Sequence, residues 1–374
     1  MNFDFSDDEK HLREEAHRFL RDKCPITRVR AALDAGLDHD PELWREIAAM
    51  GWTSITIPEA YGGLGLSQLD LCVIAEELGR SLAPIPTVSS IYMATDALTR
   101  LGSEKQKQDW LPRLAQGDTI ATVAWAETAA ASTSQEAAMR FVGGAISGSK
   151  LPVSAGMSAN LAIVSARVAE GSGLYLVDLT HAGVTRERID VVDPTRGHSA
   201  LHFNNVPAER LGNRDAGELL ETILARAAVP TAFEQVAGAE AALQAARGYA
   251  LERFAFGRQI GSFQAIKHKL ADMFVAVQLA RSNAYYAAWA LSTEDPELAM
   301  ASACARVSAC RAFDLNAQEN LHIHGGVGYT WEADCHLHYR RARELSLILG
   351  SPLAWKERVA RGLEARRSSV RDAA

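Results

Sequence analysis

The amino-acid sequence predicts a mainly α-helical protein with a barrel-like β-domain between two helical domains. Apolar residues recur at helical spacing over residues 1–118. Over residues 119–214 they gather in short runs rich in β-branched side chains, separated by Gly, Ser and Asp. Helical spacing returns over residues 215–374. We therefore expect three domains with these boundaries.

The first domain carries recognisable helix start and stop signals. Ser6 and Glu9 form a capping box ahead of an apolar helical face. A second apolar face spans residues 43–48, and a third helix is predicted over residues 68–79. Between them, residues 58–63 are rich in Pro and Gly and must form a turn or loop.

The middle and last domains differ in their hydrophobic period. Apolar runs at residues 161–164 and 174–177 are short enough to be strands of an antiparallel barrel or sandwich. After them, helical patterns extend to about residue 291, from 298 to 322, and from about 335 to the C-terminus. We therefore expect the last domain to consist of long helices.

Composition excludes several classes of protein. The chain has 374 residues, 48% of them apolar, and its formal net charge of −7 gives no support to a nucleic-acid surface. Its N-terminus is charged and no run of about 18 apolar residues occurs, so we expect a soluble, cytoplasmic protein without a membrane segment. The five cysteines lack a Cys-x-x-Cys spacing, which favours reduced thiols over disulfides or a zinc site.

Two segments of the last domain carry most of the functional signal. In the first, Arg253 can give a planar, bidentate pair to a pyrophosphate, and Gly257 lets the backbone turn closely beside it. In the second, Gly325 and Gly326 stand at the tip of a helix-to-helix turn, where bare backbone can lie against a nucleotide. Such a glycine turn, taken alone, is also typical of plain chain reversal.

In this order and at this spacing, both segments resemble the C-terminal domain of the acyl-CoA dehydrogenase family, flavoproteins that oxidise the α,β bond of acyl-CoA thioesters. The resemblance extends over nearly the whole chain, through residues 43–44, 58–65 and 76–79. It implies a helical N-terminal domain, a middle β-domain and a C-terminal four-helix bundle. It also implies FAD as the cofactor and an acyl-CoA as the substrate.

The family's catalytic base is a Glu that takes the α-proton while a hydride leaves the β-carbon. Counted onward from Arg340, the matching position carries Leu349, which cannot accept a proton. Some members place the base on the helix before the Arg-x-x-Phe-Gly turn, where ungapped counting reaches Ala227. Glu234 lies two helical turns later on roughly the same face. It is either a candidate base or a polar contact of an amphipathic helix.

The segments that meet the flavin ring in the family also differ here. Residues 126–133 replace the family's Thr-Glu-Pro-Gly-Ala-Gly-Ser-Asp, with alanines in place of its turn glycines. Residues 150–156 replace Lys-x-Trp-Ile-Thr-Asn-Gly, and Pro152 stands where the family has a Trp stacked by the flavin. Ser154 matches the Thr and keeps a hydroxyl.

The nucleotide contacts are retained better. In the family, one subunit binds the pyrophosphate and adenine of its neighbour's FAD. The resemblance assigns this role to seven residues, which we name the cofactor half-site: Arg253, Phe256, Gly257, Gln264, His322, Gly325 and Gly326. His322 replaces a Gln and keeps one hydrogen bond. We therefore expect FAD to be shared across a subunit interface.

This combination resembles the non-catalytic subunit of the family's heterotetrameric steroid-CoA dehydrogenases. It implies a homologous partner subunit that carries the catalytic Glu, a steroid side-chain thioester as a candidate substrate, and an electron-transferring flavoprotein as electron acceptor. Two alternatives stay open. One is a self-sufficient homo-oligomeric flavoenzyme, either a dehydrogenase using Glu234 or a flavin monooxygenase. The other is a scaffold subunit without a cofactor.

Histidines and aromatic residues also gather around the glycine turn. The histidines form two His-x-His pairs, namely His322, His324, His336 and His338. Residues two apart on a helix point to different sides, so we expect no metal site. Tyr329 and Trp331 are interpreted as closing a core beside the turn, with an acyl or flavin pocket as the alternative.

Overall fold

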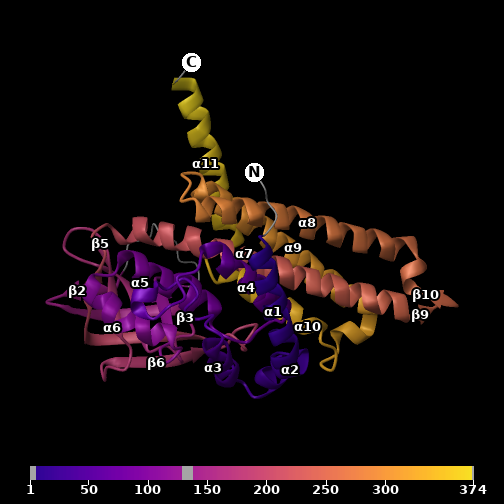
Figure 1. Ribbon diagram of the computed structural model, residues 1–374, viewed down its shortest axis with the longest axis horizontal. Helices are drawn as coiled ribbons and strands as arrows, with labels where there is room; N and C mark the ends of the chain where they lie inside the picture. Colours follow the sequence, from indigo (N-terminus) through magenta and orange to yellow (C-terminus); the bar gives the residue numbers. More distant parts are fainter. Residues whose placement is uncertain (1–5, 129–137, 373–374) are drawn as a thin grey trace. The chain divides into compact units, whose positions relative to one another are not determined.

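Figure 1 shows the chain as a computed structural model, which describes residues 6–128 and 138–372. The chain divides into two compact units. One contains the segments up to Arg30, Cys72–Ala83 and Ala228 onward, and the other contains Ala31–Leu71 and Pro84–Ala227. This division groups segments by contact rather than by order in the sequence, so the three predicted domain boundaries stay a prediction.

The helices and strands follow the predicted order of helical, β-rich and helical stretches (Figure 1), so the predicted fold class is confirmed. The first helices are α1 (Asp7–Lys23), α2 (Ile26–Asp34), α3 (Pro41–Ala49), the 3-10 turn η1 (Glu59–Tyr61), α4 (Gln68–Arg80), the π-helix η2 (Thr87–Thr95), α5 (Asp96–Leu101) and α6 (Glu104–Ala115). The middle strands are β1 (Ala121–Ala124), β2 (Arg140–Val142), β3 (Ala145–Ser154), β4 (Leu161–Arg167), β5 (Ser172–Asp178), β6 (Val184–Ile189), β7 (His198–Pro207) and β8 (Glu209–Leu211). The last elements are α7 (Ala216–Glu252), β9 (Phe254–Ala255), β10 (Arg258–Gln259), η3 (Ile260–Ser262), α8 (Gln264–Ser292), α9 (Leu298–His324), η4 (Gly325–Tyr329), α10 (Cys335–Leu347) and α11 (Pro352–Asp372).

Local chemistry explains where several of these helices begin. Ser6 Oγ accepts a hydrogen bond from the Glu9 N–H at 3.2 Å, and the Glu9 carboxylate accepts one from the Ser6 N–H at 2.6 Å, which confirms the predicted capping box. Helix α4 begins at Gln68 as predicted and ends one residue later than expected, at Arg80. Helix α2 was not predicted, although it is as long as α3, whose apolar face was recognised.

The unit that holds the strands contains an eight-stranded sheet in the order β6-β7-β3-β2-β4-β5-β8, with β1 also paired to β4. The expectation of an antiparallel sheet is wrong for two strand pairs, because β1 and β2 both run parallel to β4. Strand β4 is buried along six of its seven residues, so it forms the centre of this unit's core. Strand β3 changes register between Lys150 and Val153, where Pro152 has no N–H to give to the ladder.

The other unit is built on long helices. Helix α9 packs against α8, α10 and α11. Its buried side includes several alanines, such as Ala305, Ala309 and Ala312, and small side chains let helix axes approach closely. The predicted long helices of the last part of the chain are therefore present, with the short strands β9 and β10 and the 3-10 turn η3 separating α7 from α8.

Helix α4 crosses α7 with almost no space between their backbones. A Cβ on Gly79 would meet the Glu234 carbonyl oxygen at 2.1 Å, so this crossing requires glycine. Beside it, Arg281 of α8 forms an ion pair with the buried Glu76 and donates to Glu240 at 2.9 Å. The Glu-Glu-Leu-Gly stretch at residues 76–79 therefore has a packing and charge role in joining α4 to α7 and α8.

A helix that crosses a bilayer must be both long and apolar. Within residues 6–128 and 138–372, no helix combines enough length with enough hydrophobicity to cross a bilayer.

Candidate functional site

The first segment of the predicted cofactor half-site forms a hairpin at the end of α7. Strands β9 and β10 pair antiparallel, and the two residues between them, Phe256 and Gly257, have φ of 54° and 79°. Two consecutive positive φ values are what a two-residue hairpin turn requires, which explains the Gly. The Phe256 ring is 94% exposed, and Arg253 is also exposed. A large ring held in solvent by a strained backbone is suited to contact something outside the chain.

The second segment caps helix α9. The helix ends at His324, Gly325 follows with φ of 63°, and η4 continues to Tyr329. A Cβ placed on either glycine would meet nothing within 4 Å, but Gly326 differs from Gly325 because its φ is not positive. The described fold therefore does not require glycine at position 326. A nucleotide lying against bare backbone there would require it, so this turn fits the ADP part of FAD.

Two aromatic rings join these segments. The Tyr249 ring, one turn before Arg253, stacks on the His324 ring with centroids 4.1 Å apart and planes 23° apart. His324 Nδ1 also donates to the Asn320 carbonyl at 2.8 Å, which fixes the histidine ring. Below them lies an apolar cluster that includes Ala246, Met273 and Ile323. The sequence did not predict this link, because stacking between residues 75 positions apart leaves no local pattern.

The remaining half-site residues lie on α8 and α9. Gln264 is the first residue of α8 and is exposed. His322 lies in the last turn of α9, with Nδ1 3.5 Å from Glu319 Oε2, and Glu319 also pairs with Lys269. His322 keeps an exposed ring edge with 39% of its side chain accessible, so it can still form the single hydrogen bond expected of it.

Both candidate base positions lie in the helical unit. Leu349 is fully buried between α10 and α11, and its carbonyl accepts a hydrogen bond from Trp355 Nε1 at 2.9 Å. The position that matches the family's Glu is thus filled by an apolar side chain in a packed core. Glu234 is also fully buried, at the crossing of α4 and α7 described above. Its role as a base stays a prediction.

In the β-rich unit, the segments that match the family's flavin-ring contacts are joined by a buried ion pair. Lys150 Nζ is fully buried and lies 2.7 Å from Glu127 Oε1 and 2.9 Å from Ser165 Oγ. Glu127 also accepts backbone hydrogen bonds from Ala138 at 2.7 Å and Met139 at 3.1 Å. Residues 129–133 of the predicted segment lie outside the described residues.

Burial and charge shift both members of this pair. Burial lowers the pKa of Lys150, and the hydrogen bond and charge of Glu127 oppose it without reversing it. Burial alone would raise the pKa of Glu127, but the hydrogen bond and charge of Lys150 and the backbone hydrogen bonds from Ala138 and Met139 together lower it. The sequence did not predict this pair, although both residues stand in the segments compared with the family. Ser154 closes β3, where its carbonyl accepts from the Thr122 hydroxyl at 2.7 Å.

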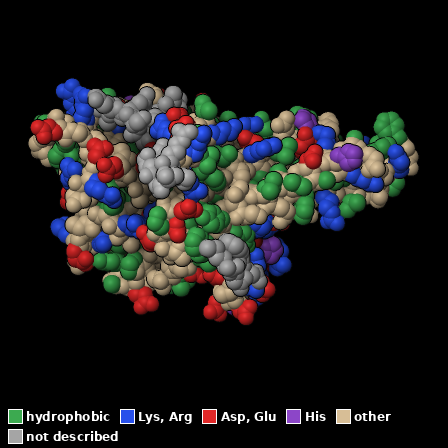
Figure 2. All heavy atoms as spheres, turned by 90° about the horizontal axis from the view of Figure 1, so that it is seen from above, with side chains coloured by type: hydrophobic (Ala, Val, Ile, Leu, Met, Phe, Trp, Pro, Cys, Tyr) green, Lys and Arg blue, Asp and Glu red, His purple; other side chains and the backbone are tan. Residues whose placement is uncertain are grey.

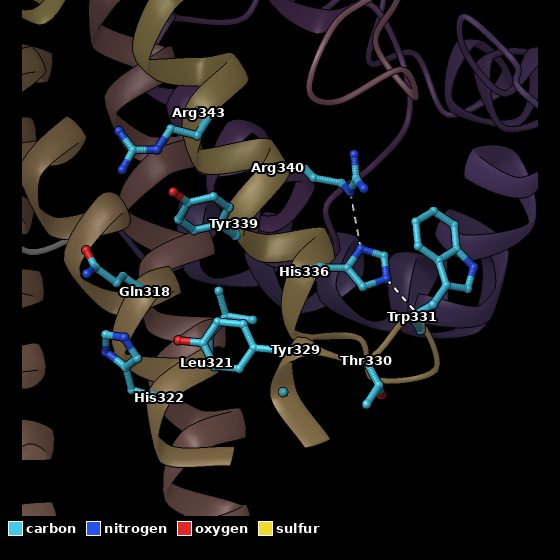
Figure 3. Close-up of a pocket in the computed structure, with 11 residues that line it drawn as sticks. Gln318, Leu321, His322, Tyr329, Thr330, Trp331, His336, Tyr339, Arg340 and Arg343 are labelled. Atoms are coloured by element: carbon cyan, nitrogen blue, oxygen red, sulfur yellow. Dashed lines mark hydrogen bonds between the residues drawn. The ribbon is translucent and has the colours of Figure 1, made fainter. Parts of the chain in front are cut away.

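A pocket of about 610 Å³ opens beside the half-site, lined by α9, η4, α10 and the loop between the last two (Figure 3). Tyr329 and Trp331 line it, with 65% and 52% of each residue exposed. The interpretation that these two aromatic residues close a core is therefore wrong. Both residues stay exposed after the glycine turn and line a pocket, and the alternative of an acyl or flavin pocket stays a prediction.

The four histidines do not converge. His324 stacks on Tyr249, and His336 donates from Nε2 to the Trp331 carbonyl at 3.1 Å. His338 is buried, which lowers its pKa to about 4. Within the described part of the chain, no group of three or more His, Cys, Asp or Glu side chains is placed to hold a metal ion.

Comparison with known proteins gives two family matches. Residues 6–118 match the description "Acyl-CoA dehydrogenase, N-terminal domain", and residues 217–363 match "Acyl-CoA dehydrogenase, C-terminal domain". The chain is also 30% identical over 348 residues to the acyl-CoA dehydrogenase IpdE2 of Mycolicibacterium smegmatis. That alignment covers 93% of this chain and 96% of the relative.

Two solved structures are similar along nearly the whole chain. The Tcur3481-Tcur3483 steroid ACAD is 29% identical with a TM-score of 0.86, and the match covers 97% of this chain and 99% of that chain. The ChsE4-ChsE5 complex from Mycobacterium tuberculosis is 27% identical with a TM-score of 0.86 and the same coverage.

Proposed function

Because this chain belongs to the acyl-CoA dehydrogenase family of oxidoreductases, we propose that it is one subunit of a heteromeric, FAD-dependent acyl-CoA dehydrogenase. In this proposal the chain contributes the cofactor half-site and part of the assembly. A homologous partner contributes the catalytic Glu. The two subunits then share FAD across their interface.

The observation that carries this proposal is a contrast between two sites in the helical unit. The half-site residues Arg253 and Phe256 are exposed, and Gly326 is a glycine that the described fold does not require. Leu349, at the base position, is instead apolar and fully buried. A chain that retains surface contacts for a nucleotide and has lost the proton acceptor is suited to complete another chain's active site.

The roles of this chain's residues follow from their chemistry. FAD, when bound, supplies the hydride acceptor for α,β-desaturation. Arg253 would pair with its pyrophosphate, because a guanidinium can give two parallel hydrogen bonds to phosphate oxygens. The Phe256 ring would cover the nucleotide, and the stacked rings of Tyr249 and His324 would hold the two half-site segments in register.

An exposed apolar face supports assembly with another subunit. Phe274, Val275 and Leu279 of α8 are each more than half exposed, and Val275 and Leu279 are four residues apart and therefore neighbours on the helix surface. We name these three residues the α8 stripe. Figure 2 shows hydrophobic side chains at the surface of the long helices. Large apolar side chains exposed to water on one helix favour burial against a partner.

The proposal also names a substrate, an electron acceptor and a location in the cell. A similar structure is named a steroid ACAD, and another is named as a complex of two chains. We propose by analogy a CoA thioester of a steroid side chain as the substrate. An electron-transferring flavoprotein would accept the electrons, and the complex would work in the cytoplasm.

Co-purification followed by flavin counting tests the proposal. The chain is expressed alone and together with each candidate homologous partner, and FAD is counted per chain. We expect a colourless chain alone, and a yellow complex with one FAD for each pair of chains. A homomer that binds FAD and turns over acyl-CoA unaided would contradict the proposal and favour the self-sufficient enzyme. A complex that binds no FAD would favour the cofactor-free scaffold.

A further inference from the structure

A short loop, residues 330–334, joins the glycine turn of the cofactor half-site to α10. The turn itself is η4, which follows α9 and contains Gly325 and Gly326. Among the five residues of η4, all of which the structure describes, only Gly328 is buried. A turn with so few buried side chains gains little rigidity from packing. Its position therefore depends on how its two ends are held.

The end of the turn next to α9 is held by close backbone packing. A Cβ on Gly328 would meet the Leu321 carbonyl oxygen at 2.6 Å and the His324 Cβ at 2.9 Å, so the turn lies directly on α9. At the other end, the Thr330 N–H and hydroxyl both donate to the Val327 carbonyl at 3.0 Å. These contacts are local, so they fix the turn on α9 but not the path of the loop that follows.

Arg30 of α2, which stands 301 to 304 positions earlier in the sequence, binds this loop. Its Nη1 donates to the Trp331 carbonyl at 2.7 Å, and its Nε and Nη2 donate to Asp334 Oδ1 at 3.0 and 2.6 Å. Nη2 also donates to the Glu332 carbonyl at 3.4 Å. Because the Arg30 side chain is only 20% exposed, water screens this charge-assisted pair less than a pair at the open surface.

The planar guanidinium is the feature that suits Arg30 to this position. It reaches acceptors near both ends of the loop at once, the Trp331 carbonyl at one end and the Asp334 carboxylate at the other. A lysine ammonium could pair with the carboxylate, but it has no fixed fork of donors to reach the carbonyl in the same geometry. The side chain at position 30 therefore closes the loop in a way that charge alone does not provide.

The Trp331 carbonyl has a second donor, from α10. His336 Nε2 donates to it at 3.1 Å, and His336 Nδ1 accepts from Arg340 Nε at 3.3 Å (Figure 3). These two partners assign the ring proton to Nε2, and burial, which lowers the pKa of His336, keeps the ring neutral near neutral pH. The Trp331 ring also stacks on the His336 ring, with centroids 4.9 Å apart. The loop is thus held between Arg30 on one side and α10 on the other.

We propose that Arg30 is a positioning residue for the cofactor half-site. It fixes the loop 330–334, and through the loop it keeps the turn at Gly325 and Gly326 in the arrangement that binds the nucleotide. This inference rests on the proposed function, because the turn binds FAD only under that proposal. Without Arg30 the turn would sample other arrangements, and the apparent affinity would fall in proportion to the fraction of chains that keep the binding arrangement.

Hydrogen–deuterium exchange of the full chain, read by mass spectrometry, tests the contact without any cofactor. We expect Arg30→Gln to raise the exchange rate of the amides in residues 325–334 by about tenfold or more, since charge-assisted hydrogen bonds are lost. Arg30→Lys should recover only part of the protection. The matched control is Arg28→Gln, because Arg28 is on the same helix and donates to the Lys23 carbonyl at 2.9 Å. Thermal unfolding of each variant checks that the fold is intact.

Titration of the co-purified complex with FAD tests the link to the half-site. We expect Arg30→Gln to weaken FAD binding by about fivefold or more. The rate of flavin reduction by acyl-CoA at saturating FAD should stay unchanged, because a positioning residue changes how often the turn is ready and not the chemistry. The Arg28→Gln complex should bind FAD as tightly as the unaltered complex.

The two measurements separate this inference from the proposed function. Unchanged exchange at residues 325–334 overturns the inference, whatever the complex binds. Faster exchange with unchanged FAD affinity also overturns it, because Arg30 would then hold the loop without preparing the half-site. An unaltered complex that retains no FAD contradicts the proposed function itself. The inference then falls with that function, even where exchange shows that Arg30 holds the loop.

Discussion

Arg253 and Leu349 are the two residues on which the proposed division of labour depends. Arg253 follows α7 and is exposed, with its N–H donating to the Tyr249 carbonyl at 2.8 Å. Leu349 is buried and offers only its carbonyl to a neighbour. One side chain can reach a ligand and the other cannot act as a base. The sequence alone did not show that Arg253 is exposed and Leu349 is buried.

Replacing Arg253 tests the half-site at a single residue. We expect Arg253→Ala to weaken FAD binding by the co-purified complex by about tenfold or more, because a charge-assisted hydrogen bond is lost. Arg361→Ala, on exposed α11, serves as the control. FAD retained per pair of chains is measured by absorbance after gel filtration. Equal retention in both variants would remove Arg253 from the site.

Because His338 is buried, we expect the free energy of unfolding to depend on pH. Burial lowers its pKa from 6.5 to about 4 in the folded chain. Between these values the unfolded chain binds a proton that the folded chain does not, so stability falls as pH decreases from about 6.5 to about 4, by up to about 3 kcal/mol. We expect His338→Gln to flatten this part of the profile in urea unfolding, and the exposed His181→Gln to leave it unchanged. Identical profiles for His338→Gln and the natural chain would contradict the assignment.

At the scale of elements, the crossing of α4 and α7 determines how part of the helical unit packs. The sequence marked residues 76–79 as a stretch shared with the family, without a reason for the glycine. The reason is the approach of Gly79 to the Glu234 carbonyl. Glycine is needed there because backbone, rather than a movable side chain, fills the space.

We expect Gly79→Ala to destabilise the chain by at least about 2 kcal/mol, since the added methyl group forces the two helices apart. Gly248→Ala is the matched control, because Gly248 lies within α7 and a Cβ there meets nothing within 4 Å. The control should be neutral or more stable by about 1 kcal/mol. Thermal unfolding of both variants is the measurement. A Gly79→Ala chain as stable as the control would refute the close crossing.

The helices and strands also show how much of the structure could be predicted from the sequence. Long elements such as α7 and α9 were predicted, because many residues repeat the helical period. The parallel pairing of β1 and β2 with β4 was not, because strand direction depends on contacts across the fold. At the site, the family resemblance indicated Arg253 and Gly326. The Tyr249–His324 stack and the pocket beside the half-site depend on tertiary contacts and left no sequence pattern.

For the whole molecule, assembly is the property that the proposed function requires. Each residue of the α8 stripe is more than half exposed, and Phe256 is almost fully exposed. A heteromeric enzyme would bury such surfaces between subunits and bring the half-site to the partner's cofactor. Proteins that function as monomers rarely keep apolar faces of this kind.

Charges placed on the α8 stripe test this requirement. We expect the double variant Phe274→Asp and Leu279→Asp to prevent co-purification with the partner while the chain stays folded, because two desolvated carboxylates would face an apolar surface. Val142→Asp, on the exposed strand β2, is the control. Gel filtration with light scattering gives the assembly state, and circular dichroism checks the fold. An intact complex carrying both charges would exclude the stripe from the interface.

The location of the catalytic base is tested most directly by flavin reduction in the assembled complex. Under anaerobic conditions, acyl-CoA is mixed with complexes that carry Glu234→Gln in this chain or a Glu→Gln change at the partner's base. We predict that the Glu234→Gln complex is reduced at the unaltered rate, and that the partner variant is slower by about a hundredfold or more. Loss of reduction on changing Glu234, with the partner variant still active, would contradict the proposal and make this chain the catalytic subunit.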